Sequence, residues 1–129
     1  MGDRVTYVFE QNNASPIFLY GHWAGHNMMG NLADAIVFAW DRIQMDDEPY
    51  ATRQMISHLI GDEWTQETGW GLTTYFCESE HSIPVINVHN KTVRLLPLHP
   101  WSEQFDLNAE AKFVMTMQQF LDKFAKVLV

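Results

Sequence analysis

The spacing of hydrophobic residues changes twice along this chain, and that change constrains the fold more than any other feature. From Arg4 to Glu10 apolar and polar side chains alternate, which is the period of a strand with one buried face. Between residues 31 and 60 apolar residues recur every three or four positions, which is typical of helices. After residue 71 β-branched and aromatic residues dominate. The sequence therefore predicts an α+β fold.

The turn residues of segment 12–16 separate the first strand from a second one, predicted from Ile17 to about Trp23, and the two are expected to form an antiparallel hairpin. A helix is then predicted from Asn31, as N-cap, to Met45. Its apolar residues extend well beyond one stripe, so it is either buried on two sides or offers one side to a partner.

Acidic residues followed by a proline predict the start of a second helix, which extends from Glu48 to Ile60 and stops at Gly61. Three strands are predicted next, at 71–77, 83–88 and 92–98, and their short connections favour an antiparallel meander. A last amphipathic helix is predicted over 109–129. The order ββααβββα indicates an antiparallel sheet of about five strands with helices packed mainly on one face, in a single domain over 1–129.

Charge is distributed unevenly along the chain. Residues 34–80 hold ten acidic side chains against Arg42 and Arg53, a balance of −8, whereas the remainder is neutral. Binding to a phosphate backbone depends on clustered lysine and arginine, so direct nucleic-acid binding is not expected. With one cysteine, Cys77, no internal disulfide can form, which suits a reducing compartment. Neither a signal peptide nor a membrane-spanning run is readable, so a soluble cytoplasmic protein is expected.

The end of the second predicted strand carries the first group of candidate ligand-binding residues, Tyr20, His22 and Trp23. Glycines surround them, and the side chains there face an opening. His22 and His26 are four residues apart, yet a pair of histidines without a third ligand falls short of a metal motif, so no metal and no cofactor are predicted. Trp70 lies between two glycines directly before a strand, an arrangement that allows close approach of another chain or simply closes the end of a core.

The start of the second predicted helix carries the other candidate group, Asp47, Tyr50 and Arg53. Arg53 could pair with a carboxylate or phosphate while Tyr50 stacks on a ring. Acids at a helix start also stabilise the helix dipole, and that structural role explains Asp47 and Glu48 fully. The functional hypothesis requires this group to converge with the first one in a common recess.

Four segments of the chain resemble a family of small proteins encoded by bacteriophages of actinobacteria, a family without an assigned activity. The resemblance covers roughly residues 1–90 and is carried by the segments 1–4, 19–25, 46–53 and 67–71. It implies a phage origin and a location in the host cytoplasm, and it carries over no catalytic residue.

Three functions are compatible with these residues. The first is a non-catalytic protein that binds a host protein or a small ligand, since no nucleophile, metal or phosphate motif is present. The second is a small hydrolase that uses His22 with Asp47 or Glu48, oriented by Tyr50 and Arg53. The third is an acidic mimic of nucleic acid. A homodimer is also expected, because the helix over 31–45 and the last helix are broadly apolar.

Overall fold

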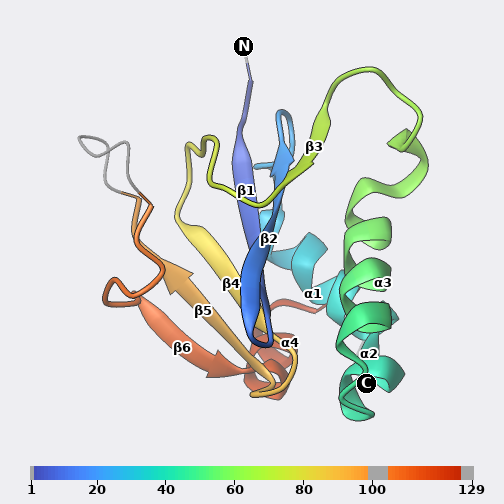
Figure 1. Cartoon of the computed structure of the whole chain (residues 1–129), viewed down its shortest axis with the longest axis vertical. Coiled ribbons are helices and arrows are strands. Elements are labelled where there is room, and N and C mark those ends of the chain that lie inside the picture. Colours follow the sequence, from blue (N-terminus) through green and yellow to red (C-terminus); the bar gives the residue numbers. More distant parts are fainter. Residues whose placement is uncertain (1, 99–104, 126–129) are drawn as a thin grey trace.

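A computed structural model describes residues 2–98 and 105–125 of the chain and contains one six-stranded sheet (Figure 1). Its strands lie in the order β3-β2-β1-β4-β5-β6. The strands are β1 Val5–Gln11, β2 Ala14–Gly21, β3 Trp70–Thr73, β4 Ile83–Asn87, β5 Thr92–Leu96 and β6 Phe113–Thr116. The helices are α1 Met28–Phe38, α2 Trp40–Gln44, α3 Glu48–Ile60 and α4 Met117–Phe124, with the short 3₁₀ helix η1 at Gly61–Glu63. The α+β class predicted from the sequence is confirmed.

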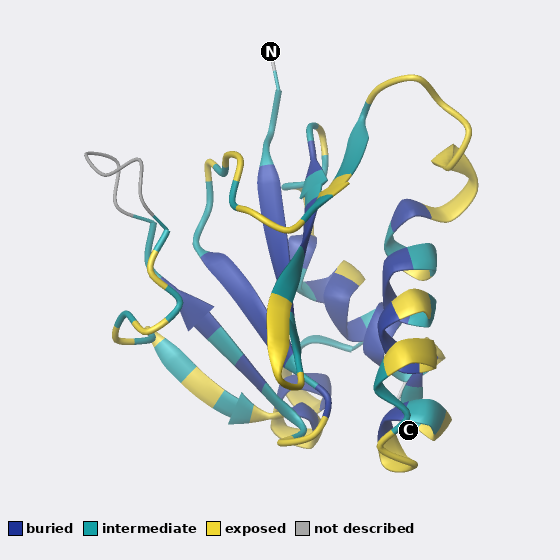
Figure 2. Ribbon diagram, in the orientation of Figure 1, coloured by how far each residue is buried: buried dark blue, intermediate teal, exposed yellow. Residues whose placement is uncertain are grey.

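The predicted hairpin is present as β1 and β2, which pair antiparallel around a turn at Asn12 and Asn13. Asn13 adopts a left-handed φ of 57°, a conformation that asparagine tolerates well. Alternation along β1 suggested one buried face, but every residue from Val5 to Phe9 is buried (Figure 2). The hydroxyl of Thr6 donates a 2.6 Å hydrogen bond to the carbonyl of Glu78, which satisfies the buried polar group.

The sheet is mixed, so the antiparallel sheet of about five strands predicted from the sequence is wrong in its pairing. β4 lies parallel to β1, and β3 pairs with β2 rather than with β4, so the predicted meander reduces to the β4–β5 hairpin. Residues Ile83–Ile86 of β4 are all buried, as expected of a strand covered on both faces. Alternation and turn chemistry indicated most of the strand segments, but the choice of neighbour in the sheet depends on contacts between residues far apart in the sequence.

The helices gather on one face of the sheet, as predicted. Their buried side chains join those of Val5, Tyr7 and Phe9 in the main core, whereas the opposite face packs Val8 and Phe18 against side chains from connecting segments. Those covering side chains are Phe76, Leu98, Phe105, Leu107 and Ala111.

The predicted start of the first helix at Asn31 is wrong, because α1 begins at Met28 and its N-cap position is Asn27. Asn27 has a φ of 56°, and a side chain at Gly30 would meet the Asn27 amide at 2.6 Å, so glycine allows this start. The chain breaks again at Ala39, between α1 and α2. α3 has the predicted bounds, with Asp47 accepting a hydrogen bond from the backbone N–H of Tyr50.

The predicted helix from residue 109 to 129 is also wrong. Phe113–Thr116 form β6, which pairs with β5, and α4 starts only at Met117. Thr116 and Gln119 form a capping box that fixes this start, because each side chain accepts a hydrogen bond from the backbone N–H of the other residue. Residues 126–129 of the predicted helix lie outside the described residues.

Candidate functional site

The structure separates the two groups of candidate residues that the sequence analysis placed in one recess. Glu48, at the start of α3, accepts hydrogen bonds from the backbone N–H of Asn12 in the hairpin turn, with distances of 3.0 and 3.2 Å. Tyr20 pairs instead with Thr6, near the other end of β1. Asn12 lies six residue steps along the strand from Thr6, a separation of about 20 Å. Figure 1 shows α3 starting at the end of the sheet opposite to the end of β2.

This separation removes the hydrolase hypothesis in the form stated above. A general acid and base must reach hydrogen-bond distance of a shared substrate, and His22 lies at the wrong end of the sheet to act with Asp47 or Glu48. The two groups therefore have to be considered as separate surfaces.

The group at the start of α3 is held by interactions within the protein. Asp47 pairs with Arg42 at 3.0 Å, and the Arg42 guanidinium lies 5.1 Å from the centre of the Tyr50 ring. Arg53 is exposed. Asp47 and Tyr50 thus stabilise the junction of α2 and α3, the structural role that the sequence analysis allowed for the acid.

The neighbouring acids connect α3 to two turns. Glu48 pairs with His89 Nε2 at 3.1 Å in addition to its bonds from Asn12. Asp46 accepts a 2.7 Å hydrogen bond from Lys91 Nζ, and this lysine lowers the pKa of the Asp46 carboxyl. Much of the negative charge at this point is therefore matched by a cation.

The other candidate group does converge. Tyr20, His22, Trp23 and Trp70 line one cavity of about 390 Å³ at the end of β2 and the start of β3. We call this cavity the aromatic recess; its remaining lining residues are Thr68, Gly69 and Gly71. Four of the predicted ligand-binding residues thus meet in one place, although they come from segments about 50 positions apart in the sequence.

Side chains within the aromatic recess order one another. The Tyr20 hydroxyl and His22 Nδ1 are hydrogen-bonded at 2.8 Å, and the His22 and Trp23 rings meet edge to face with centres 4.5 Å apart. Burial raises the pKa of the Tyr20 hydroxyl, and the negative charge of Glu78 raises it further, so the phenol stays neutral at ordinary pH. The recess offers aromatic faces and a neutral hydroxyl, which suits packing and stacking.

Glycines on either side of Trp70 open the aromatic recess. Gly69 has a φ of 109°, which side-chain-bearing residues rarely adopt, and a side chain there would lie 3.6 Å from the Trp23 ring. Gly71 sits opposite Tyr20 in the sheet, and a side chain on it would fill the space beside that ring. The positive φ explains the glycine at position 69, whereas the close approach of another chain, which the Gly-Trp-Gly pattern allowed, stays a prediction.

Trp70 itself points toward the helix side of the sheet. Its side chain packs on the main core, and its indole N–H donates a 3.2 Å hydrogen bond to Glu63. Together with Ile60, Trp64 and Leu72 it borders a smaller cavity of about 150 Å³. β3 therefore has a recess beside each of its faces.

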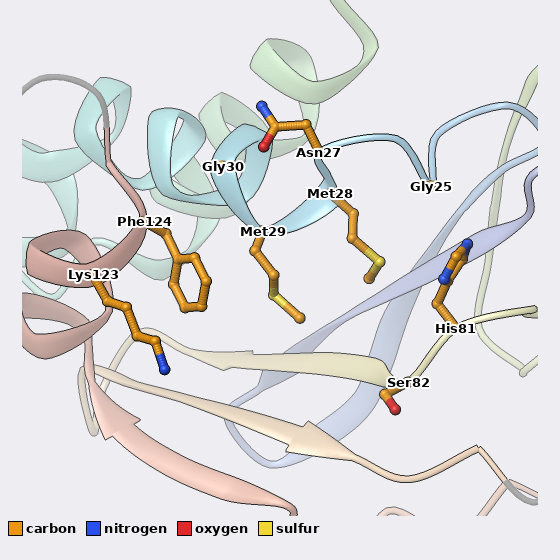
Figure 3. Close-up of a pocket in the computed structure, with 9 residues that line it drawn as sticks. All are labelled: Gly25, Asn27, Met28, Met29, Gly30, His81, Ser82, Lys123 and Phe124. Carbon is orange, nitrogen blue, oxygen red and sulfur yellow. The ribbon is translucent and has the colours of Figure 1, made fainter.

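A third cavity, of about 530 Å³, lies between the start of α1, the start of β4 and the end of α4 (Figure 3). His81 and Lys123 stand on opposite sides of it, with Met28 and Met29 between them (Figure 3). His81 Nε2 is held by Asp3 at 2.5 Å. The sequence analysis missed this cavity, because its lining residues come from three distant segments and form no local motif.

Within residues 2–98 and 105–125, no three His, Cys, Asp or Glu side chains gather as metal ligands would. In the same residues no helix has both the length and the apolar character needed to cross a bilayer. No protein-family model matches the chain, and no curated protein or solved structure shows significant similarity to it.

Proposed function

We propose that this chain is a non-catalytic binding protein, and that the aromatic recess together with β3 forms its binding surface. One observation carries the proposal, namely that large apolar side chains around β3 are left in solvent. Trp23 is 61% exposed, Trp64 and Leu72 are each 49% exposed, and Tyr75 is 67% exposed. Tryptophan and tyrosine are the residues that most often anchor protein interfaces, and clustered exposed apolar side chains mark interaction sites.

A binding role is favoured over catalysis by the chemistry of the recess. Its imidazole, on His22, is hydrogen-bonded to the Tyr20 hydroxyl rather than to a carboxylate. The acids that the hydrolase hypothesis required lie about 20 Å away, as estimated from strand length. Aromatic faces with one neutral hydroxyl recognise a partner by packing and stacking.

A protein of the host cell is the partner that we propose, with the chain acting as a phage accessory protein in the host cytoplasm. This part of the proposal rests on the resemblance of segments 1–4, 19–25, 46–53 and 67–71 to proteins of actinobacterial phages. A small planar ligand is the second candidate, because the recess volume of about 390 Å³ falls within the range of small-molecule sites. Mimicry of nucleic acid is less favoured, since Asp46 and Asp47 pair with Lys91 and Arg42, and Glu48 is bound by His89.

Self-association stays a prediction. α1 buries most of its apolar residues against the sheet and its neighbouring helices, but Phe38 is 59% exposed and Met45 is 66% exposed. Sedimentation at micromolar concentration would show a species of twice 15.0 kDa if these side chains meet in a dimer. If sedimentation shows a single species of 15.0 kDa, the predicted dimer is contradicted.

The binding proposal can be tested by photo-crosslinking in an actinobacterial host extract. A benzophenone amino acid replaces Trp23 in one sample and Val114 in another, because Val114 is equally exposed, at 61%, on the opposite edge strand. We expect one discrete protein adduct at position 23 and none at position 114. The same adducts at both positions, or none at either, would contradict a binding surface at β3.

Small-ligand binding has a separate readout. Tryptophan fluorescence is followed while planar heteroaromatic compounds such as adenosine are added, with the Trp23→Ala variant as the control. Saturable quenching that this substitution abolishes would favour the second candidate. No change up to millimolar concentration would exclude it for that class of compound.

A further inference from the structure

β3 is an edge strand whose outer backbone groups are available for pairing. His22 N donates a 2.8 Å hydrogen bond to Gly69 O, and these two residues lie directly opposite each other in the β2–β3 register. Hydrogen-bonded pairs alternate along an antiparallel ladder, so Gly71 also bonds to β2 whereas the backbone groups of Trp70 and Leu72 point away from it. No backbone bond from another segment of residues 2–98 or 105–125 reaches Trp70 or Leu72.

The edge of β3 is limited by its short length but carries no other common protection against pairing. Natural edge strands are also blunted by lysine, proline or a bulge, and β3 has the sequence Trp-Gly-Leu-Thr with a regular register. The strand is short, so an added strand would gain up to four main-chain hydrogen bonds, from the N–H and C=O groups of Trp70 and Leu72.

Recesses lie on both faces of this edge. Trp70 and Leu72 point to the helix side and border the smaller cavity, whereas Gly69 and Gly71 face the aromatic recess on the other side. Side chains of an added strand alternate between the two faces, so successive residues would enter the two recesses in turn. This is the arrangement by which sheet edges bind extended peptides, with affinity from the backbone and specificity from side-chain pockets.

The charge around β3 indicates which peptide fits. Residues 54–90 contain no lysine or arginine, and the exposed segment from η1 to β3 carries Asp62, Glu63 and Glu67. Trp23 adds an exposed aromatic face at the aromatic recess, where apolar side chains can pack. A second copy of this chain fits less well, because pairing β3 with another β3 would bring two acidic segments together.

Resting on the proposed binding function, we infer that the outer edge of β3 accepts an extended polypeptide segment with alternating cationic and apolar residues, which adds to the sheet as a seventh strand. The backbone groups of Trp70 and Leu72 bond to the segment. Its cationic side chains point to the helix side, where Glu63 lines the smaller cavity, and its apolar side chains enter the aromatic recess on the other face.

The probe is an acetylated seven-residue peptide that alternates lysine and valine, with a glutamate-for-lysine peptide as its charge control. Binding is measured from tryptophan fluorescence and from amide NMR shifts. We expect the lysine peptide to bind, to shift the amides of Trp70 and Leu72, and to bind more weakly as salt is added. The glutamate peptide should bind at least about tenfold more weakly.

Two backbone changes test strand addition itself. Methylating alternate peptide nitrogens removes the donors on one edge of the probe, and one of the two methylation patterns should weaken binding by about tenfold or more. Leu72→Pro removes an outward N–H that takes no part in the β2 ladder, and should have a similar effect. Val114→Pro on the opposite edge strand β6 is the matched control and should bind like the parent chain.

Each result decides between the alternatives. Binding that survives both methylation patterns and Leu72→Pro would overturn strand addition, and equal binding of the glutamate peptide would overturn the cationic partner. Self-association that Leu72→Pro abolishes would assign the edge to a second copy. If the lysine peptide fails to bind while a crosslink still forms at position 23, this inference fails and the proposed binding function stands.

Discussion

Glu48→Ala tests most directly whether the polar start of α3 is structural rather than part of a site. The Glu48 side chain is 14% exposed, accepts hydrogen bonds from the Asn12 backbone at 3.0 and 3.2 Å, and pairs with His89 at 3.1 Å. One carboxylate thus joins the β1–β2 turn and the β4–β5 turn to the first turn of α3. Removing it leaves the Asn12 N–H and the His89 ring without this partner.

The magnitude follows from these contacts. A hydrogen bond to a charged group contributes about 1.5–3 kcal/mol, and an acid in the first turn of a helix adds about 0.3–1 kcal/mol. Because Asn12 and His89 are exposed, solvent screens both contacts and we take the lower end, a loss of about 2 kcal/mol. An unfolding entropy of about 2.1 cal/mol/K per residue over 129 residues converts this into a fall in Tm of about 7 °C.

Thermal unfolding followed by circular dichroism at pH 7 measures this change. Glu67→Ala is the matched control, because Glu67 is exposed, and its free energy of unfolding should stay within about 0.5 kcal/mol of the parent. The double variant with His22→Ala should be additive, since the two sites lie about 20 Å apart. An unchanged Tm for Glu48→Ala, or strong coupling to His22, would refute the structural assignment and reopen a joint site.

Three further substitutions test the fold. Tyr7 is buried, its hydroxyl donates a 3.1 Å hydrogen bond to the Met28 carbonyl, and burial raises its pKa. The stability that comes from keeping this phenol protonated is present below the unfolded pKa of about 10 and is lost as pH rises above it. Tyr7→Phe should therefore make the free energy of unfolding less sensitive to pH between about 10 and 12, as measured by denaturant titration. Thr116→Ala removes the cap of α4 and should lower the free energy of unfolding by about 1 kcal/mol, whereas Thr116→Ser should retain most of it. Phe120→Ala empties a fully buried position and should cost about 3–5 kcal/mol in urea unfolding, so a loss below 1 kcal/mol would contradict the placement of α4 on the core.

The sequence predicted an element correctly where the residues that cause it to form all lie within one short segment. Asp47, Pro49 and Gly61 define the start and stop of α3, and the helix has the predicted bounds. Alternation in β1 and turn residues at Asn12 and Asn13 define the first hairpin. In the last segment the same reasoning failed, because the apolar spacing around Phe113 suits both a helix and a strand, and pairing with β5 selected the strand.

For the candidate site, too, the sequence predicted the local features and the tertiary structure decided which of them come together. The sequence by itself determined that Tyr20, His22, Trp23 and Trp70 sit beside glycines at strand ends, where side chains can form a recess. Only the tertiary structure decided that they meet one another and not Asp47, because neighbours in a sheet are chosen by burial of both faces of β1 and β4 rather than by order along the chain. The open edge of β3 is a result of that choice, since pairing with β2 rather than β4 left β3 outermost in the sheet.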